Sequence, residues 1–235
     1  MSNQRPRDLI RFYDLLNTLE GHIGGPRHLT ECNGRLTWPA RGIYFFREQG
    51  ENRSDSGSGP RVVRVGTHAL NAGSGTKLWG RLSQHRGTAS SGGGNHRGSI
   101  FRLIVGKSLM SRDDIACSTW GQGNSASREI REGERGLEQV VSREIGVMPF
   151  LWLDIGDEPS RSSLRGLIER NSIALLSNSH KEPLDPSSKD WLGRHCNRDR
   201  VVRSGLWNSN HVGEQYDPGF LDTLERLIEK MDVTT

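Results

Sequence analysis

Two short stretches decide how this chain is expected to fold: Gly42-Ile43-Tyr44-Phe45-Phe46 and Val62-Val63-Arg64-Val65-Gly66. Both are rich in β-branched and aromatic residues, a composition typical of strands. Between them, residues 48–60 are rich in glycine, serine and charged side chains, which favour a loop. The pattern therefore predicts a β-hairpin with a long, mobile connection.

Amphipathic helices are expected on both sides of this hairpin. Apolar residues recur at helical spacing in an N-terminal stretch that ends near Gly21, and in a C-terminal stretch that Asp217 can cap and Pro218 can start. Further helices are expected over residues 77–86, 137–144 and 161–178, and a buried strand over residues 147–155. Residues 100–105 are apolar without a clear type, and residues 108–134 are polar and irregular, as in an insertion or a flexible arm.

This order of elements predicts an α/β (α+β) fold, in which a small mixed sheet starts with a β-hairpin and is flanked by helices. The 235 residues are enough for a single domain, 1–235, that buries a core of its own. Within it we expect a core over residues 41–178 with an insertion around residues 106–134. A helical N-terminal extension over residues 1–40 and a C-terminal extension over residues 179–235 complete the chain.

At Gly42-Ile43-Tyr44 and Arg64-Val65-Gly66 the chain resembles the GIY-YIG nuclease superfamily. A helix with Arg81 and His85, a buried strand and a helix with Glu169 then follow in the order that the family shows. The resemblance covers residues 41–178 and implies a GIY-YIG-type catalytic core there. It also implies an endonuclease that hydrolyses nucleic-acid phosphodiester bonds, with DNA as the expected substrate and Mg²⁺ or Mn²⁺ as the cofactor.

The resemblance implies a role for each matching residue. Tyr44 orients or deprotonates the attacking water, Arg81 neutralises the phosphate in the transition state, and His85 assists. Apart from the resemblance, Arg81 and His85 are four residues apart on one face of their expected helix, a pattern more typical of a solvated face. Glu169 is the implied metal ligand, although a carboxylate between apolar residues needs only some cationic partner, and an arginine would also serve.

The chain departs from the family pattern at Arg64, where the second motif has a tyrosine. Without this phenol, another group could take part in the proton transfer. His68 is a candidate base or phosphate contact because its ordinary pKa lies near neutrality. The family also has an asparagine that supports the metal site. Asn178 matches it by order, unless it only caps its helix, and Asn208 and Asn210 are the rivals in the C-terminal extension.

A glycine-rich loop over residues 90–94 precedes Asn95, His96 and Arg97. Their side chains suit contact with nucleic acid at the edge of the site, and a solvated turn is the alternative. His211, like His195 and Cys196, lacks the paired spacing of zinc ligands.

Composition agrees with a nucleic-acid partner without proving one. The net charge is +4, and the 32 basic residues include few lysines, namely Lys77, Lys107, Lys181, Lys189 and Lys230. Arginine suits phosphate recognition, but codon usage in a GC-rich genome produces the same excess.

Three cysteines without paired spacing, a polar N-terminus and no long apolar run favour the cytoplasm and exclude a membrane span. The alternative function is a non-catalytic nucleic-acid-binding module on the same fold.

Overall fold

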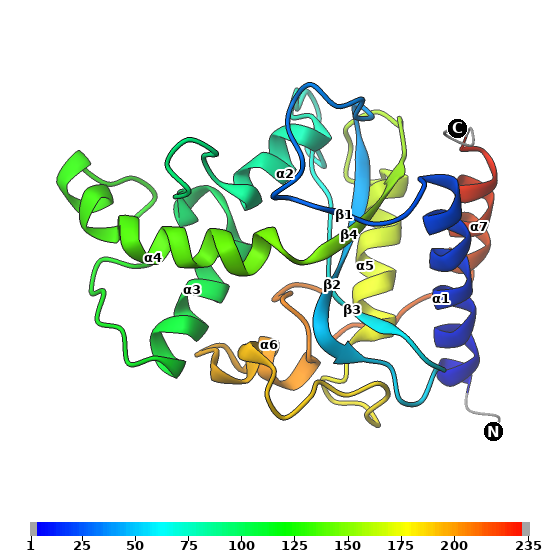
Figure 1. Cartoon of the computed structure of the whole chain (residues 1–235). Helices are drawn as coiled ribbons and strands as arrows, with labels where there is room; N and C mark the ends of the chain where they lie inside the picture. Colours follow the sequence, from blue (N-terminus) through cyan, green and yellow to red (C-terminus); the bar gives the residue numbers. More distant parts are fainter. Residues whose placement is uncertain (1–3, 232–235) are drawn as a thin grey trace.

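The computed structural model describes residues 4–231 and arranges its helices around one four-stranded sheet (Figure 1). The strands are β1 (Arg27–His28), β2 (Gly42–Asn52), β3 (Pro60–Gly66) and β4 (Pro149–Asp154). The α-helices are α1 (Gln4–His22), α2 (Leu78–Arg86), α3 (Ile100–Arg112), α4 (Arg128–Gly146), α5 (Leu164–Leu176), α6 (Asp199–Ser204) and α7 (Phe220–Glu229). Two short 3₁₀ helices are η1 (His96–Gly98) and η2 (Leu192–His195).

The sheet has the strand order β1-β4-β2-β3, so β2 lies in the interior between β3 and β4. The α+β class and the β2–β3 hairpin expected from the sequence are confirmed. The strand pairings of the described sheet are all antiparallel, where a mixed sheet was expected. The reason is that the hairpin reverses the chain after β2, and β4 later enters on the other side of β2 in the opposite direction.

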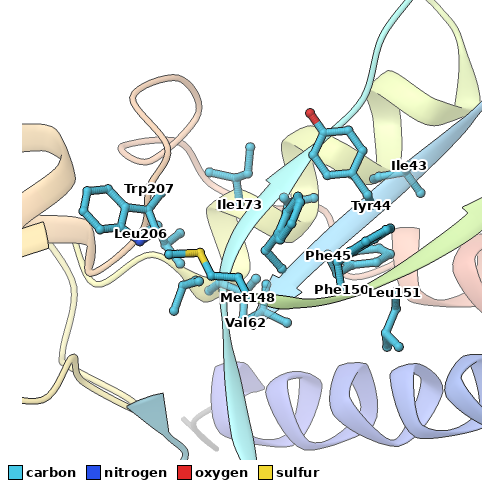
Figure 2. Close-up of a cluster of buried hydrophobic side chains, with 14 of the residues drawn as sticks. Ile43, Tyr44, Phe45, Val62, Met148, Phe150, Leu151, Ile173, Leu206 and Trp207 are labelled. Atoms are coloured by element: carbon cyan, nitrogen blue, oxygen red, sulfur yellow. The ribbon is translucent and has the colours of Figure 1, made fainter. Parts of the chain in front are cut away.

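Alternate residues of β2 face two different layers of helices. Phe45 packs its ring against Phe12 of α1, with centroids 5.9 Å apart, whereas Phe46 packs against Phe101 of α3 at 5.5 Å. Helices α1, α5 and α7 lie on one side of the sheet, and α2, α3, α4 and α6 lie on the other (Figure 1). Figure 2 shows that Leu206 and Trp207, from the C-terminal extension, join the same buried cluster.

The connection between β2 and β3 is shorter and better held than the sequence predicts. Strand β2 continues to Asn52, and the backbone N–H groups of Ser54, Asp55 and Ser56 all donate to one carboxylate oxygen of Asp185, at 2.8, 2.7 and 3.0 Å. The long connection expected over residues 48–60 is therefore wrong in its length, because only residues 53–59 join the two strands. A side chain about 130 residues away satisfies the turn, and no local pattern announces it.

The irregular segment expected over residues 108–134 is also shorter. The apolar segment after Ser99 is helix α3, and α4 begins at Arg128, so only residues 113–127 lie outside helices. Ser99 and Ser127 cap the two helices, because each hydroxyl accepts a backbone N–H three residues later. Trp120 is fully buried and holds the connection against α3. Every helix within residues 4–231 is too short or too polar to span a bilayer.

Candidate active site

The pairing of β2 with β3 places Tyr44 directly opposite Gly66. A Cβ atom at position 66 would lie 2.5 Å from the Tyr44 hydroxyl oxygen, a distance that real Cβ atoms do not reach. Only glycine therefore leaves room for the tyrosine side chain at this register. The Tyr44 ring is fully buried, and its hydroxyl points away from the apolar cluster (Figure 2).

The Tyr44 hydroxyl is hydrogen bonded to His85 of α2. The hydroxyl oxygen lies 2.8 Å from His85 Nε2, and His85 Nδ1 lies 2.8 Å from the Ser99 hydroxyl. His85 is fully buried, and burial, with the nearby charges of Arg81 and Arg64, lowers its pKa well below the usual value. The imidazole is therefore neutral at physiological pH and can exchange a proton with the phenol.

Arg64, the residue in place of the motif tyrosine, faces the same side of the sheet as Tyr44. It lies two residues before Gly66 and opposite Phe46, and alternate residues of a strand share a face. Its guanidinium donates to the backbone carbonyl of Trp207 and lies 4.6 Å from the centre of the Phe101 ring. Burial lowers the pKa of Arg64, although an arginine at this depth keeps its charge. A fixed cation thus stands near the phenol.

Arg81 is the second arginine of this cluster and is partly exposed. It donates to the Gln84 side chain at 2.9 Å and to the Gly98 carbonyl at 3.1 Å. Both partners are neutral, and the described residues give Arg81 no carboxylate partner. Its charge nevertheless lowers the pKa of His85 and that of Glu169. It is the guanidinium of the cluster that is best placed to meet a phosphate from solvent.

Glu169 reaches the cluster from α5, the layer of helices on the other side of the sheet. One carboxylate oxygen accepts the backbone N–H of Thr67, just beyond the end of β3, at 3.1 Å. Burial raises the pKa of Glu169, and the charges of Arg64 and His211 only partly oppose this. Glu169 is partly buried, its carboxylate has one hydrogen bond within residues 4–231, and it forms no ion pair there. It is the group of the cluster that most lacks a partner.

The C-terminal extension adds a further edge to β3. The backbone N–H of Trp207 donates to the Val63 carbonyl at 2.7 Å. The Asn208 side chain accepts from the backbone N–H of Val65 at 3.1 Å and donates to the Val65 carbonyl at 2.8 Å. Asn178 lies elsewhere, where it bonds Arg5 and the backbone of Leu184. Of the asparagines nominated from the sequence, Asn208 is the one that the structure bonds to β3.

A family model described as the GIY-YIG domain matches residues 3–234. The chain belongs to the GIY-YIG family. The match extends through both segments outside the 41–178 resemblance, in agreement with the contribution of Trp207 and Asn208 to the site. Neither a curated protein nor a solved structure matches the chain.

In this GIY-YIG domain, His68 is buried just beyond the end of β3, and neither ring nitrogen has a hydrogen-bond partner of normal geometry among the described residues. Burial lowers its pKa to about 4, against the opposing effect of the Ala40 carbonyl and in the same direction as the charge of Arg165. His68 is therefore neutral at physiological pH. The structure does not join it to Tyr44 by a hydrogen bond.

Of the three residues nominated as nucleic-acid contacts, Asn95 is exposed, whereas His96 and the Arg97 side chain are buried. Asn95 caps η1 by accepting the N–H of Arg97. His96 stacks on Trp120 with centroids 3.9 Å apart, and Arg97 forms a buried ion pair with Glu134. The side chains of His96 and Arg97 thus face the interior, where they join the loop to α4.

Two contributors to the site have no local signal in the sequence. The carbonyl of Trp207 fixes Arg64, although nothing around Trp207 resembles a motif. His211 is close enough to lower the pKa of Glu169, and its Nδ1 lies 2.7 Å from a carboxylate oxygen of Glu214. The unusual positive φ of His211, 63°, is the kind of feature that marks functional segments, but it is visible only in the structure.

The ligands available at Glu169 fit a hard divalent ion. Within residues 4–231, no group of three or more His, Cys, Asp or Glu side chains could enclose a metal. An ion at Glu169 would therefore be held by this carboxylate, water and phosphate oxygens of the substrate. Mg²⁺ is commonly bound in this way, with one or two carboxylates and substrate phosphates. The partly buried carboxylate of Glu169, with a single backbone hydrogen bond, meets that requirement.

Proposed function

We propose that this GIY-YIG domain is an endonuclease that hydrolyses phosphodiester bonds of nucleic acid, with DNA as the substrate. The observation that carries the proposal is the arrangement of two chemically different halves at the end of β3. One half is a phenol hydrogen bonded to a neutral imidazole, 2.8 Å away. The other is the partly buried carboxylate of Glu169, which forms no ion pair within residues 4–231, and arginines stand near both.

In the proposed reaction, Tyr44 acts on the attacking water. As the water attacks phosphorus, its proton passes to the Tyr44 oxygen, and the Tyr44 proton passes to His85 Nε2. The low pKa of His85 keeps Nε2 free to accept at neutral pH, with Nδ1–H donated to Ser99. Arg64 stabilises the negative charge that develops on the phenol oxygen during this transfer.

Arg81 and Glu169 act on the phosphate. The partly exposed guanidinium of Arg81 binds a non-bridging oxygen, where charge increases in the transition state. Glu169 would hold Mg²⁺ or Mn²⁺, which when bound supplies a positive charge beside the leaving oxygen. Thr67 donates its N–H to Glu169 and so orients the carboxylate. Asn208 supports the same site by holding β3 from its outer edge.

Cleavage of a supercoiled plasmid tests this function directly. The protein should nick the plasmid in the presence of Mg²⁺ or Mn²⁺ and should not do so in excess EDTA. Parallel reactions on single-stranded and duplex oligonucleotides of DNA and RNA define the substrate class. Absence of cleavage with either metal on every substrate would contradict the proposal.

The second candidate is a module that binds nucleic acid without cutting it. It is favoured by Arg64, which replaces the motif tyrosine, and by the complete burial of Tyr44. Metal-independent binding without nicking would support this candidate.

We place either activity in the cytoplasm, a proposal supported by three free cysteines, Cys32, Cys117 and Cys196.

A further inference from the structure

A polar hollow of about 320 Å³ lies between the glycine-rich loop after α2 and one flank of α4. Three exposed arginines of α4 line it, Arg128, Arg131 and Arg135. Their spacing of three and four residues places them on one flank of the helix. On the other wall, Gly93 and Gly94 present backbone without side chains. We call this surface the α4 arginine flank.

The charge of the α4 arginine flank is only partly cancelled by carboxylates: Glu132 and Glu138 also line the hollow, and Glu129 is exposed next to Arg128. Arg135 forms an ion pair with Glu132, but within residues 4–231 neither Arg128 nor Arg131 has a carboxylate partner. The buried glutamates of the same helix are already neutralised from the protein interior, Glu134 by Arg97 and Glu138 by Arg102. The outward surface of this part of α4 therefore presents net positive charge.

The flank is held rigidly to the candidate active site. Arg102 donates both to the carbonyl of His85, at 2.9 Å, and to Glu138 of α4. Gln139 of α4 donates to the Ser91 carbonyl in the glycine-rich loop at 2.9 Å. Phosphate groups bound at the flank would thus have a fixed position relative to Tyr44 and Glu169. The polar links from the site to α4 give the hollow a fixed shape.

We propose that the α4 arginine flank binds the phosphate backbone of the nucleic-acid substrate, outside the position of cleavage and without reading sequence. The inference rests on the proposed function and adds to it a second contact with the substrate. From Arg128 to Arg135 the helix rises by about 10 Å, comparable to three steps of about 3.4 Å along one strand of a duplex. Exposed arginines over that span, beside a wall of glycine backbone and small polar side chains, can meet more than one phosphate of a strand.

The test is a salt titration of binding with the double variant Arg128→Ala/Arg131→Ala. The matched control is Arg7→Ala/Arg226→Ala, which removes two exposed arginines from α1 and α7, on the far side of the molecule from α4 (Figure 1). Binding of a 30-base-pair DNA duplex is measured without metal, so that cleavage does not interfere. Each lost phosphate contact should lower the slope of log K against log salt by about 0.9.

We expect the α4 double variant to lose about 1.8 from the slope and more than about 10-fold in affinity at low salt. The control should keep the wild-type slope, and Arg128→Lys/Arg131→Lys should keep most of it because lysine retains the charge. Cleavage of saturating substrate should be unchanged, since neither arginine belongs to the candidate active site.

The outcomes separate this inference from the proposed function. Equal slopes for the α4 double variant and its control would overturn the inference, even if the wild-type protein cleaves DNA. A selective loss of slope in the α4 variant would support it, even if the wild type proves unable to cleave. A wild-type protein that binds no duplex at any salt concentration would overturn it as well.

Discussion

Glu138 on α4 is buried and Glu169 on α5 is partly buried, and the structure treats these two helical carboxylates in opposite ways. Glu138 accepts from the backbone and ring of His96, at 2.6 and 2.9 Å, and from the guanidinium of Arg102. Glu169 accepts one backbone N–H, that of Thr67. Burial favours the protonated form of each, but at Glu138 the hydrogen bonds from His96 and the charge of Arg102 prevail and lower the pKa. At Glu169 burial prevails and raises it.

The difference separates a structural carboxylate from one available to a ligand. Glu138 has its lone pairs occupied and joins α3, α4 and η1, so it has little capacity for another cation. Glu169 retains free lone pairs in a place where a carboxylate needs compensation. The following predictions test this division, in order of decreasing expected effect.

The largest effect is expected from Glu169→Gln, which keeps the shape of the side chain and removes its charge. If Glu169 holds the metal, plasmid nicking should fall by about 10³-fold or more, because the ion supplies several kcal/mol of transition-state stabilisation. The melting curve and metal-free DNA binding should stay close to those of the wild type. Retained nicking would show that Glu169 does not hold the metal.

The next effect is on stability and belongs to Glu138→Gln. Removing one partner of a buried ion pair leaves Arg102 without its counter-charge, at a cost of about 3–5 kcal/mol. A chain of this size should then melt about 6–20 °C lower. Nicking at a temperature where the variant remains folded should stay within about threefold of the wild type. A melt unchanged by Glu138→Gln would remove the contrast between the two glutamates.

Tyr44→Phe deletes the hydroxyl that is hydrogen bonded to His85 and leaves the packed ring in place. We expect kcat for nicking to fall by about 10²-fold or more, as for a general base or water-positioning group, with KM little changed. His68→Ala is the comparison variant, because the structure leaves His68 without a bond to Tyr44. Near-normal activity of Tyr44→Phe with inactivity of His68→Ala would transfer the role of base to His68.

The smallest effect is in the pH dependence of stability without metal, because the shifted pKa values of the two glutamates change stability in opposite directions as pH rises. The lowered pKa of Glu138 contributes stability above its unfolded value of about 4.5, and this stability is lost as pH falls through the folded pKa. The raised pKa of Glu169 contributes stability below about 4.5, and this stability is lost as pH rises through the folded pKa.

Without metal at pH 7, Glu169→Gln should therefore melt slightly above the wild type, by about 2–4 °C for each kcal/mol gained. Added Mg²⁺ should raise the melting temperature of the wild type but not that of the variant. Calorimetry at pH 4 to 8 measures both trends. A variant that melts below the wild type at pH 7 would mean that Glu169 is already compensated, as Glu138 is.

The sequence by itself determined the parts of this protein that depend on neighbouring residues. Hydrophobic periodicity and motif order gave the β2–β3 hairpin, the helices of Arg81, His85 and Glu169, and the α+β class. They also nominated Tyr44 and placed Gly66 at the end of the second motif. The structure adds the reason for this glycine, since no other residue fits opposite the tyrosine. Motif residues three or four apart on a helix, or opposite in a hairpin, need little long-range information to be placed.

Only the tertiary structure decided which distant groups form hydrogen bonds with these motif residues and the strands that carry them. It brought Asn208 rather than Asn178 to the site, fixed Arg64 by the carbonyl of Trp207, and turned His96 and Arg97 toward the interior of the protein. The sequence separation between Val65 and Asn208, 143 residues, explains why no local pattern could announce the contact. Burial and hydrogen-bond satisfaction depend on the whole packed chain, and they separate the saturated Glu138 from the partner-poor Glu169.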